Sequence, residues 1–512
     1  MKRKNMTRGG YFRRFYKIAQ TKITRAVANA PKTVYSKYFL LFTLVYCIAL
    51  IPLFRANFNY IDDIGRVSEG YQFHFSRFSS DGLSNIVHDG GEFLTDISPF
   101  TQLLAVAILS IASIVAIYIL TKQKKDSKIN FWYFCAALPI GLSPYFMENL
   151  SYKYDAPYMA LSILCAILPF LFYKKENKPY GYILAGAIST ILVCTTYQSS
   201  TGIFPAITVL LALAMFNKKE DWKNIMRFVL YSVVAYIAGM LIFRFFIMES
   251  TLESGYVNGD LLEIGNLIPG AVGHYLDYAK IFYHDFSAKW LAVLAVIVIS
   301  FIITNCIKTK RSIFFALPVS ILAVVAVGAL SFGAYPFIQQ PIFSPRAMYG
   351  AFTNLALLAI VAVDFNKAYI PRICSVYIAY AFIVFAMSYG NALNVQKTYV
   401  EYRISLVAND LNSIYAENSD DMQLDVDGTV GLAPSVANLA NRKYPVIRRL
   451  VPVLFGDDNW MWGTAMINYG HYPIYGTSRR AEEFDASGME LVRRTRMHDI
   501  YQDEDKVLVE LK

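Results

Sequence analysis

Residues 100–125 read FTQLLAVAILSIASIVAIYILTKQKK, an apolar run that ends in a group of lysines. No charged residue occurs from position 100 to position 120, and a helix of that length crosses the hydrocarbon layer of a bilayer, which is about 30 Å thick. Lysines directly after such a helix are typical of a cytoplasmic loop. The stretch therefore predicts a transmembrane helix that ends on the cytoplasmic side.

Ten further apolar runs have a similar character. They lie at about 38–54, 131–147, 158–173, 180–196, 202–216, 225–248, 290–307, 312–332, 348–363 and 368–388. The charge-free stretch 179–217 would be about 58 Å long as one helix, so the polar segment 195–202 is expected to divide it into two spans. The chain is therefore predicted to be an α-helical polytopic membrane protein with about eleven transmembrane helices.

The composition agrees with a membrane protein. Of the 512 residues, 55% are hydrophobic and 17% are charged, whereas soluble chains carry about 25% charged residues. These values exclude a disordered chain, a collagen-like fibre and one large soluble enzyme. Residues 1–37 hold eleven of the 48 basic residues and no acidic one, which leaves 37 basic residues against 38 acidic ones in the rest of the chain. Because the excess charge is confined to a tail, nucleic acid is not expected as a partner.

The basic tail allows two interpretations. Apolar residues at helical spacing alternate with arginines and lysines over 11–30, which suits an interfacial helix on an anionic cytoplasmic leaflet. A solvated basic tail that only sets the orientation fits equally well.

The loops between the runs alternate in charge. The loops after the second, fourth, sixth, eighth and tenth runs are basic, and the intervening loops hold few cations. With the basic N-terminus, this pattern predicts an N-in/C-out orientation. We therefore expect a cytoplasmic segment at 1–37, a transmembrane domain at 38–389 with long outward loops at 55–99 and 249–289, and a small periplasmic α/β domain at 390–512. A multi-pass protein of a bacterial inner (plasma) membrane is the working assumption.

Two adjacent carboxylates follow the first run, in the stretch Tyr60-Ile61-Asp62-Asp63-Ile64-Gly65-Arg66. They should lie near the membrane–water boundary, where partial burial raises a carboxylate pKa and a cation such as Arg66 lowers it. Such a group can accept a proton from a sugar hydroxyl. A helix cap or a solvated pair of aspartates is the alternative.

Other outward loops hold further candidates. Glu148, Lys153 and Asp155 lie in one short loop, where Lys153 either binds an anion or pairs locally with one of the two acidic residues. Arg346 follows two prolines, and its guanidinium suits a phosphate group or serves as a lipid-headgroup anchor. The segment Asp96-Ile97-Ser98-Pro99 is typical of the start of a helix.

Several chemistries are not indicated. The six histidines and six cysteines lack the spacing of metal ligands, and the chain contains no P-loop, GxGxxG or GxSxG motif. No metal site is therefore predicted, although the sequence leaves open whether the protein uses a divalent cation such as Mg²⁺ or Mn²⁺.

Taken in order, the stretches 60–66, 96–99 and 148–155 resemble the serotype-converting glucosyltransferases of bacterial O-antigen, a family of GT-C-type membrane glycosyltransferases. The resemblance covers about residues 40–390. It implies a GT-C-like fold and periplasmic transfer of glucose, or a related hexose, from a polyprenyl-phosphate sugar to lipid-linked O-antigen. Similar enzymes work among bilayer lipids, beside a small flippase and a separate synthase of the donor lipid.

On this resemblance we expect an inverting mechanism with an aspartate base, either Asp63 or its neighbour Asp62. The other candidates would bind the substrates: Arg66, Glu148, Lys153, Asp155 and Arg346. Arg346 is the first candidate to stabilise the departing phosphate, and Arg66 and Lys153 are weaker candidates. Glu148 and Asp155 would position the sugar or the cations.

Two other classes stay open. One is another polyprenyl-linked glycan enzyme, such as an O-antigen polymerase or a lipid A aminosugar transferase. The other is a flippase or transporter for a lipid-linked sugar, which should carry ionisable residues deep within its spans. Arg244 and Asp364 lie near the ends of their spans instead, and this favours chemistry at one face.

Overall fold

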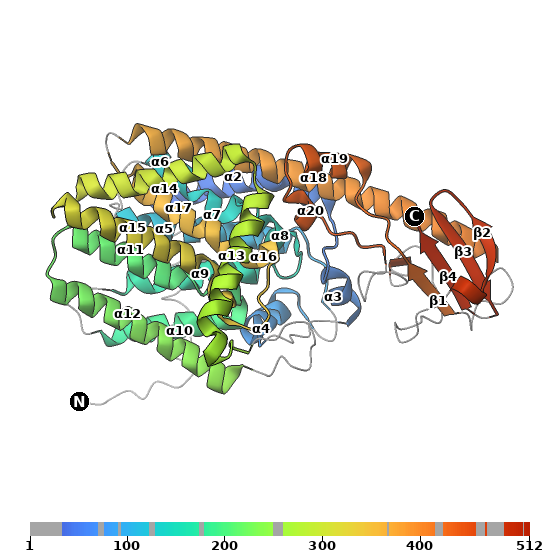
Figure 1. Ribbon diagram of the computed structural model, residues 1–512, viewed down its shortest axis with the longest axis horizontal. Helices are drawn as coiled ribbons and strands as arrows, with labels where there is room; N and C mark the ends of the chain where they lie inside the picture. Colours follow the sequence, from blue (N-terminus) through green and yellow to red (C-terminus); the bar gives the residue numbers. More distant parts are fainter. Residues whose placement is uncertain are drawn as a thin grey trace, which may run out of the picture.

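The computed structural model describes residues 33–69, 76–90, 94–121, 129–173, 179–248, 260–365, 368–414, 423–456, 466–467, 486–504 and 506–512. It is mostly α-helical, with a small sheet near the C-terminal end (Figure 1). The predicted interfacial helix at 11–30 and the lysines at 122–128 and 174–178 lie outside the described residues.

Eight of the described helices are long and apolar enough to cross a bilayer. They are Val34–Ala56 (α2), Phe100–Thr121 (α5), Gln198–Asn217 (η3 and α11), Trp222–Ile247 (α12 and η4), Ala288–Lys308 (α14), Ile313–Phe332 (α15 and η7), Pro345–Val363 (α16 and α17) and Tyr369–Ile414 (α18). Three shorter apolar helices coincide with the remaining predicted runs: Phe131–Leu142 (α6 and α7), Ala156–Leu171 (α9 and η2) and Tyr180–Thr196 (α10). The chain is thus a polytopic helical membrane protein, whereas the count of eleven spans and the N-in/C-out orientation stay predictions.

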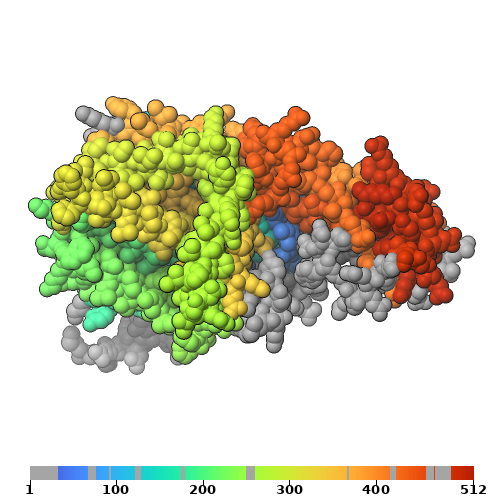
Figure 2. All heavy atoms as spheres, viewed as in Figure 1, coloured from blue at the N-terminus to red at the C-terminus, as the bar shows by residue number. Residues whose placement is uncertain are grey.

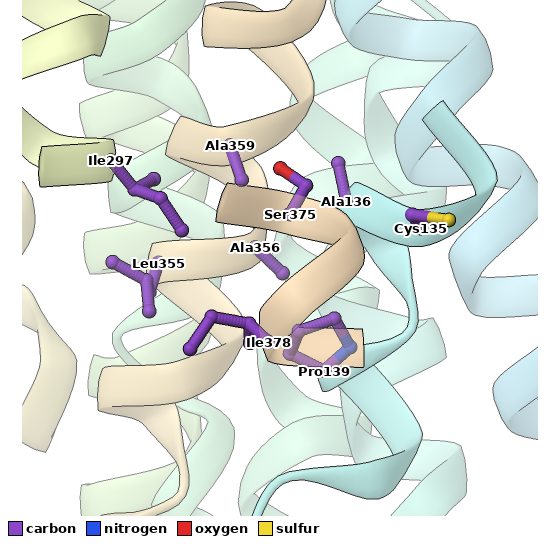
Figure 3. A pocket seen from close by; sticks show the side chains of 9 residues that line it. All are labelled: Cys135, Ala136, Pro139, Ile297, Leu355, Ala356, Ala359, Ser375 and Ile378. Atoms are coloured by element: carbon purple, nitrogen blue, oxygen red, sulfur yellow. The ribbon is translucent and has the colours of Figure 1, made fainter. Parts of the chain in front are cut away.

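The bundle relies on close approaches between helices. Gly390 of α18 faces the backbone of α2, and a Cβ atom there would lie only 2.4 Å from the amide nitrogen of Leu53. Small residues allow such contacts between membrane helices. A small apolar cavity lies between α6, α7, α14, α17 and α18, lined by Pro139, Ile297 and Ile378 among others (Figure 3). None of the predicted site residues lines it, so this cavity belongs to the packing of the bundle.

Helix α18 joins the two parts of the chain that the sequence analysis divides at 389/390. It runs for 46 residues without a break, which corresponds to about 69 Å, so it extends well beyond the thickness of a bilayer. The last predicted apolar run, 368–388, therefore continues as one helix into the region expected to be periplasmic (Figure 1). The division into domains remains a prediction.

The expected small C-terminal sheet is present. Its four strands are Gln423–Asp427 (β1), Glu490–Arg494 (β2), His498–Asp503 (β3) and Lys506–Leu511 (β4), in the order β1-β4-β3-β2. Strand β1 runs parallel to β4, and the other neighbours are antiparallel. Helices Pro434–Arg442 (α19) and Ile447–Leu450 (α20) follow β1.

Arg403 of α18 attaches the sheet to the bundle. Its side chain is buried and donates hydrogen bonds to the carbonyl oxygens of Met497 (2.6 Å) and Lys512 (2.9 Å). Removing the guanidinium breaks both hydrogen bonds to these partly buried oxygens, and a hydrogen bond to a charged group contributes about 1.5–3 kcal/mol. We expect Arg403→Met to speed proteolytic release of a C-terminal fragment about tenfold in detergent, whereas Arg493→Met, at an exposed ion pair, should leave the rate unchanged. Equal rates in both variants would contradict this role for Arg403.

Candidate active site

The predicted site residues gather at one end of the bundle. They come from Asp63–Glu69 (α3) and the turn before it, from Phe146–Ser151 (α8) and the segment after it, and from Pro345–Met348 (α16). In Figure 1 these elements and α20 lie at the end of the bundle that faces the sheet. Figure 2 shows the surface hollowed between Leu267–Asp285 (α13) and the orange segment that holds α19 and α20, with blue and teal atoms at the bottom of the hollow.

Asp63 is the buried member of the aspartate pair. It is the first residue of α3 and only 1% exposed. Its Oδ2 accepts hydrogen bonds from the backbone N–H groups of Tyr60 (2.8 Å) and Lys153 (3.1 Å). The side chain therefore ties the turn before α3 to the segment that follows α8.

The surroundings of Asp63 favour its neutral form. Burial raises its pKa to about 8, against the opposing effects of the two backbone N–H groups and the Lys153 charge, while the nearby Asp155 adds to the rise. The carboxyl group is therefore mostly protonated at neutral pH. A protonated group whose Oδ2 already accepts two hydrogen bonds is a poor proton acceptor.

Asp62 has a different environment. Its side chain is partly exposed, and within the described ranges no hydrogen bond or ion pair engages its carboxylate. The carboxylate lies close enough to Glu148 to raise the pKa of that residue. The structure thus distinguishes two aspartates that are equivalent in the sequence pattern.

Glu148 and Arg346 are neighbours. Oε2 of the buried Glu148 accepts a hydrogen bond from the backbone N–H of Arg346 at 2.7 Å, and Oε1 lies 3.9 Å from the Arg346 Nε. Burial raises the pKa of Glu148, and the charge of Arg346 opposes the rise. The guanidinium lies 5.3 Å from the centre of the Tyr152 ring. Asp62, Glu148 and Arg346 therefore form one electrostatic group.

Lys153 has partners other than those expected. Its Nζ donates to Oδ1 of Asn59 at 2.5 Å and forms an ion pair with Asp96 at 3.2 Å. The local pair with Asp155 or Glu148, one of the two alternatives in the sequence analysis, is therefore not the one that forms. Although partial burial opposes the shift, hydrogen bonds from Ser98 and the charge of Lys153 lower the pKa of Asp96. Oδ1 of Asp96 also accepts a hydrogen bond from the backbone N–H of Ser98, two residues before α5 begins.

Arg66 and Asp155 form a second ion pair, at 3.2 Å, with both side chains largely shielded from solvent. It joins α3 to the start of α9. Together with the pair between Lys153 and Asp96, it fixes the segments around Asp63.

Sequence reasoning missed a set of residues around α20. Arg449 forms an ion pair with Asp285 at the end of α13 and donates a hydrogen bond to the carbonyl oxygen of Phe343. The hydroxyl of Tyr145 donates to the same Asp285 carboxylate at 2.7 Å. No local pattern in the sequence connects Arg449 with a loop about 100 residues earlier, so only the fold reveals this contact.

The part of the chain that the structure describes contains no group of three or more His, Cys, Asp or Glu side chains that could hold a metal ion. All six cysteines are free thiols.

The protonation of Asp63 should be visible in stability. Because its pKa is higher in the folded protein than in an unfolded chain, the folded state binds the extra proton between about pH 4 and pH 8, and stability falls as the pH rises through this window. In Asp63→Asn this contribution is absent. We expect thermal unfolding in detergent to depend less on pH in Asp63→Asn than in the wild type. Parallel curves for the two proteins would contradict a protonated Asp63.

The fold and the site define a polytopic membrane protein with a carboxylate and guanidinium groups at one end of its helical bundle. The sequence model of the family described as Glucosyl transferase GtrII matches residues 51–357, and the chain belongs to this family. It is therefore a glycosyltransferase, and the resemblance to a glucosyltransferase family is confirmed. The matched range includes all seven predicted site residues but ends before Arg449.

One relative is distant but covers most of the chain. A protein of Salmonella phage P22, described as an uncharacterized 55.3 kDa protein in the gtrB 5' region, is 24% identical over 457 residues. The match covers 86% of this chain and 90% of the phage protein. No solved structure matches the chain.

Proposed function

We propose that this protein transfers glucose, or a related hexose, from a polyprenyl-phosphate sugar to lipid-linked O-antigen on the periplasmic face of the bacterial inner membrane. Membership of a glucosyltransferase family supports the sugar, and an apolar bundle supports a donor with a lipid tail. The observation that carries the proposal is the partly exposed Asp62 carboxylate beside Glu148 and Arg346, at one end of the bundle.

The proposed reaction is a single inverting displacement. A hydroxyl oxygen of the acceptor sugar attacks the anomeric carbon of the donor, and the Asp62 carboxylate accepts the proton from that hydroxyl. The bond between the anomeric carbon and the phosphate oxygen breaks, and the polyprenyl phosphate leaves with the electron pair. The guanidinium of Arg346 stabilises the negative charge on the departing phosphate.

This proposal chooses Asp62 over Asp63, the first candidate in the sequence analysis. Asp63 is buried and bound to two backbone N–H groups, so it cannot approach a substrate without breaking the turn that it holds. Its proposed role is to position the Asp62 turn against the segment that contains Lys153.

Among the cations, Arg346 is favoured for the phosphate. Arg346 lies beside Glu148, which is also close to Asp62, the proposed base. Arg66 and Lys153 form ion pairs of 3.2 Å with Asp155 and Asp96 instead. Arg66, Lys153 and Asp155 are therefore proposed to fix the loops. The flippase and the donor-lipid synthase stay expectations that follow from the resemblance.

A transfer assay with the purified protein tests the donor class. The protein is placed in liposomes with O-antigen-bearing lipid and radiolabelled glucose, supplied either as the polyprenyl phosphate or as UDP-glucose. We expect label in the acceptor only with the lipid donor. Transfer from UDP-glucose would contradict the proposed donor, and label that crosses the bilayer without transfer would indicate a flippase.

A further inference from the structure

The short helix α20 contacts the two loops that carry the proposed reaction. It lies about 90 residues beyond the part of the chain that the family model matches. Ile447 and Leu450 are fully buried, and Tyr444 just before the helix packs against Trp290 of α14 and Phe385 of α18, with ring centres 5.8 and 5.1 Å apart. The helix is therefore anchored on the bundle.

At one side, α20 holds the loop that leads to Arg346. The guanidinium of Arg449 donates to the carbonyl oxygen of Phe343, three residues before Arg346, and pairs with Asp285. The sulfur of Met348, the last residue of α16, lies 3.7 Å from the same guanidinium. Because Arg346 contacts Glu148 through its backbone N–H, the path of this loop sets the position of the arginine.

At the other side, α20 holds the turn that carries Asp62. The carbonyl oxygen of Leu450 accepts hydrogen bonds from the Tyr60 hydroxyl at 2.7 Å and the Tyr389 hydroxyl at 3.2 Å. Tyr60 is buried two residues before Asp62, and its ring meets that of Tyr152 edge to face, with centres 4.9 Å apart. The adjacent residues Arg449 and Leu450 thus reach both loops.

We propose that α20 acts as a clamp: its contacts with residues 58–66 (the Asp62 turn) and 338–348 (the Arg346 loop) set the separation between these two segments. Arg449 is then a positioning residue for transfer. The inference rests on the proposed function and gives the C-terminal segment a part in it. A base and a phosphate-binding group must face opposite sides of the anomeric carbon, so small changes in their separation reduce the rate strongly.

The test compares Arg449→Ala with Arg448→Ala, its matched control. Arg448 is exposed and its guanidinium donates to Asn441, away from both loops. The first readout is hydrogen exchange of backbone amides in full-length protein in detergent. We expect exchange about tenfold faster in Arg449→Ala over residues 58–66 and 338–348, and wild-type exchange in Arg448→Ala. Unchanged exchange in both loops would overturn the clamp.

The second readout is turnover. We expect Arg449→Ala to lower kcat about 100-fold with a donor KM within about threefold of the wild type, and Arg449→Lys, which can keep the ion pair with Asp285, to recover part of the loss. Tyr60→Phe removes the hydrogen bond from the Tyr60 hydroxyl to the Leu450 carbonyl oxygen without changing a charge, and it should also lower kcat.

The two readouts separate the clamp from the proposed function. Faster exchange in Arg449→Ala with wild-type kcat would overturn the positioning role. A wild-type protein without transfer would overturn the proposed function, while the exchange comparison would still decide the clamp.

Discussion

Asp62→Asn should lower the turnover of the protein by about 100-fold or more, whereas Asp63→Asn should keep most of it. A positioned general base contributes about 10²- to 10⁴-fold, and an amide at position 62 cannot accept the proton of the acceptor hydroxyl. At position 63 the amide oxygen of Asn can still accept the two backbone N–H bonds that now reach Oδ2. Initial rates with saturating lipid donor measure the difference.

The two variants need a third for comparison. Asp63→Ala removes both acceptor bonds and should lose turnover together with thermal stability, because the turn before α3 is no longer held. If Asp63→Asn were inactive and Asp62→Asn active, with both proteins folded, Asp63 would be the base and its burial would have to be relieved when substrate binds.

The second large effect is expected at Arg346. Arg346→Ala should lower kcat about 100- to 1000-fold, because it removes the charge that stabilises the departing phosphate. Arg346→Lys should recover only part of this loss, since an ammonium group cannot bind a phosphate through two parallel hydrogen bonds. The measurement is kcat and donor KM for both variants with the polyprenyl-phosphate donor.

Arg244→Ala provides the matched control. Arg244 also lies at the end of a long apolar span, Trp222–Ile247, and pairs with an acidic residue, Asp260 at 3.4 Å. Both side chains are nearly half exposed, and neither residue lies in the elements that carry the proposed site residues. Its loss should leave transfer unchanged. Equal effects of the two arginine variants would contradict a specific phosphate site at Arg346.

The apolar runs could be predicted because a long charge-free stretch has few alternatives to a buried or membrane-spanning helix. The ends of the helices were harder to predict. The run expected at 131–147 is shorter in the structure, where the helical stretch ends at Leu142 and Ser143 and Pro144 follow. A proline disfavours helical backbone in the residue before it, so α8 starts anew at Phe146.

The members of the site could be predicted more readily than their roles. Asp62 and Asp63 are neighbours in sequence, and what distinguishes Asp63 includes a hydrogen bond from the backbone N–H of Lys153, about 90 residues away. The local pair considered as one alternative for Lys153 does not form for a similar reason, since its ion-pair partner Asp96 comes from another loop. The role of Arg449 could not be predicted from the sequence around it, because its partners, Asp285 and Phe343, come from distant segments.

The central claim is that a carboxylate at one end of the bundle activates a sugar hydroxyl for one direct displacement. The anomeric configuration of the product, determined by NMR spectroscopy after transfer by the wild-type protein, tests it most directly. The account predicts a new glycosidic bond of opposite configuration to the sugar–phosphate bond of the donor. A product with retained configuration would contradict it, because retention requires a covalent glycosyl–enzyme intermediate or another two-step route.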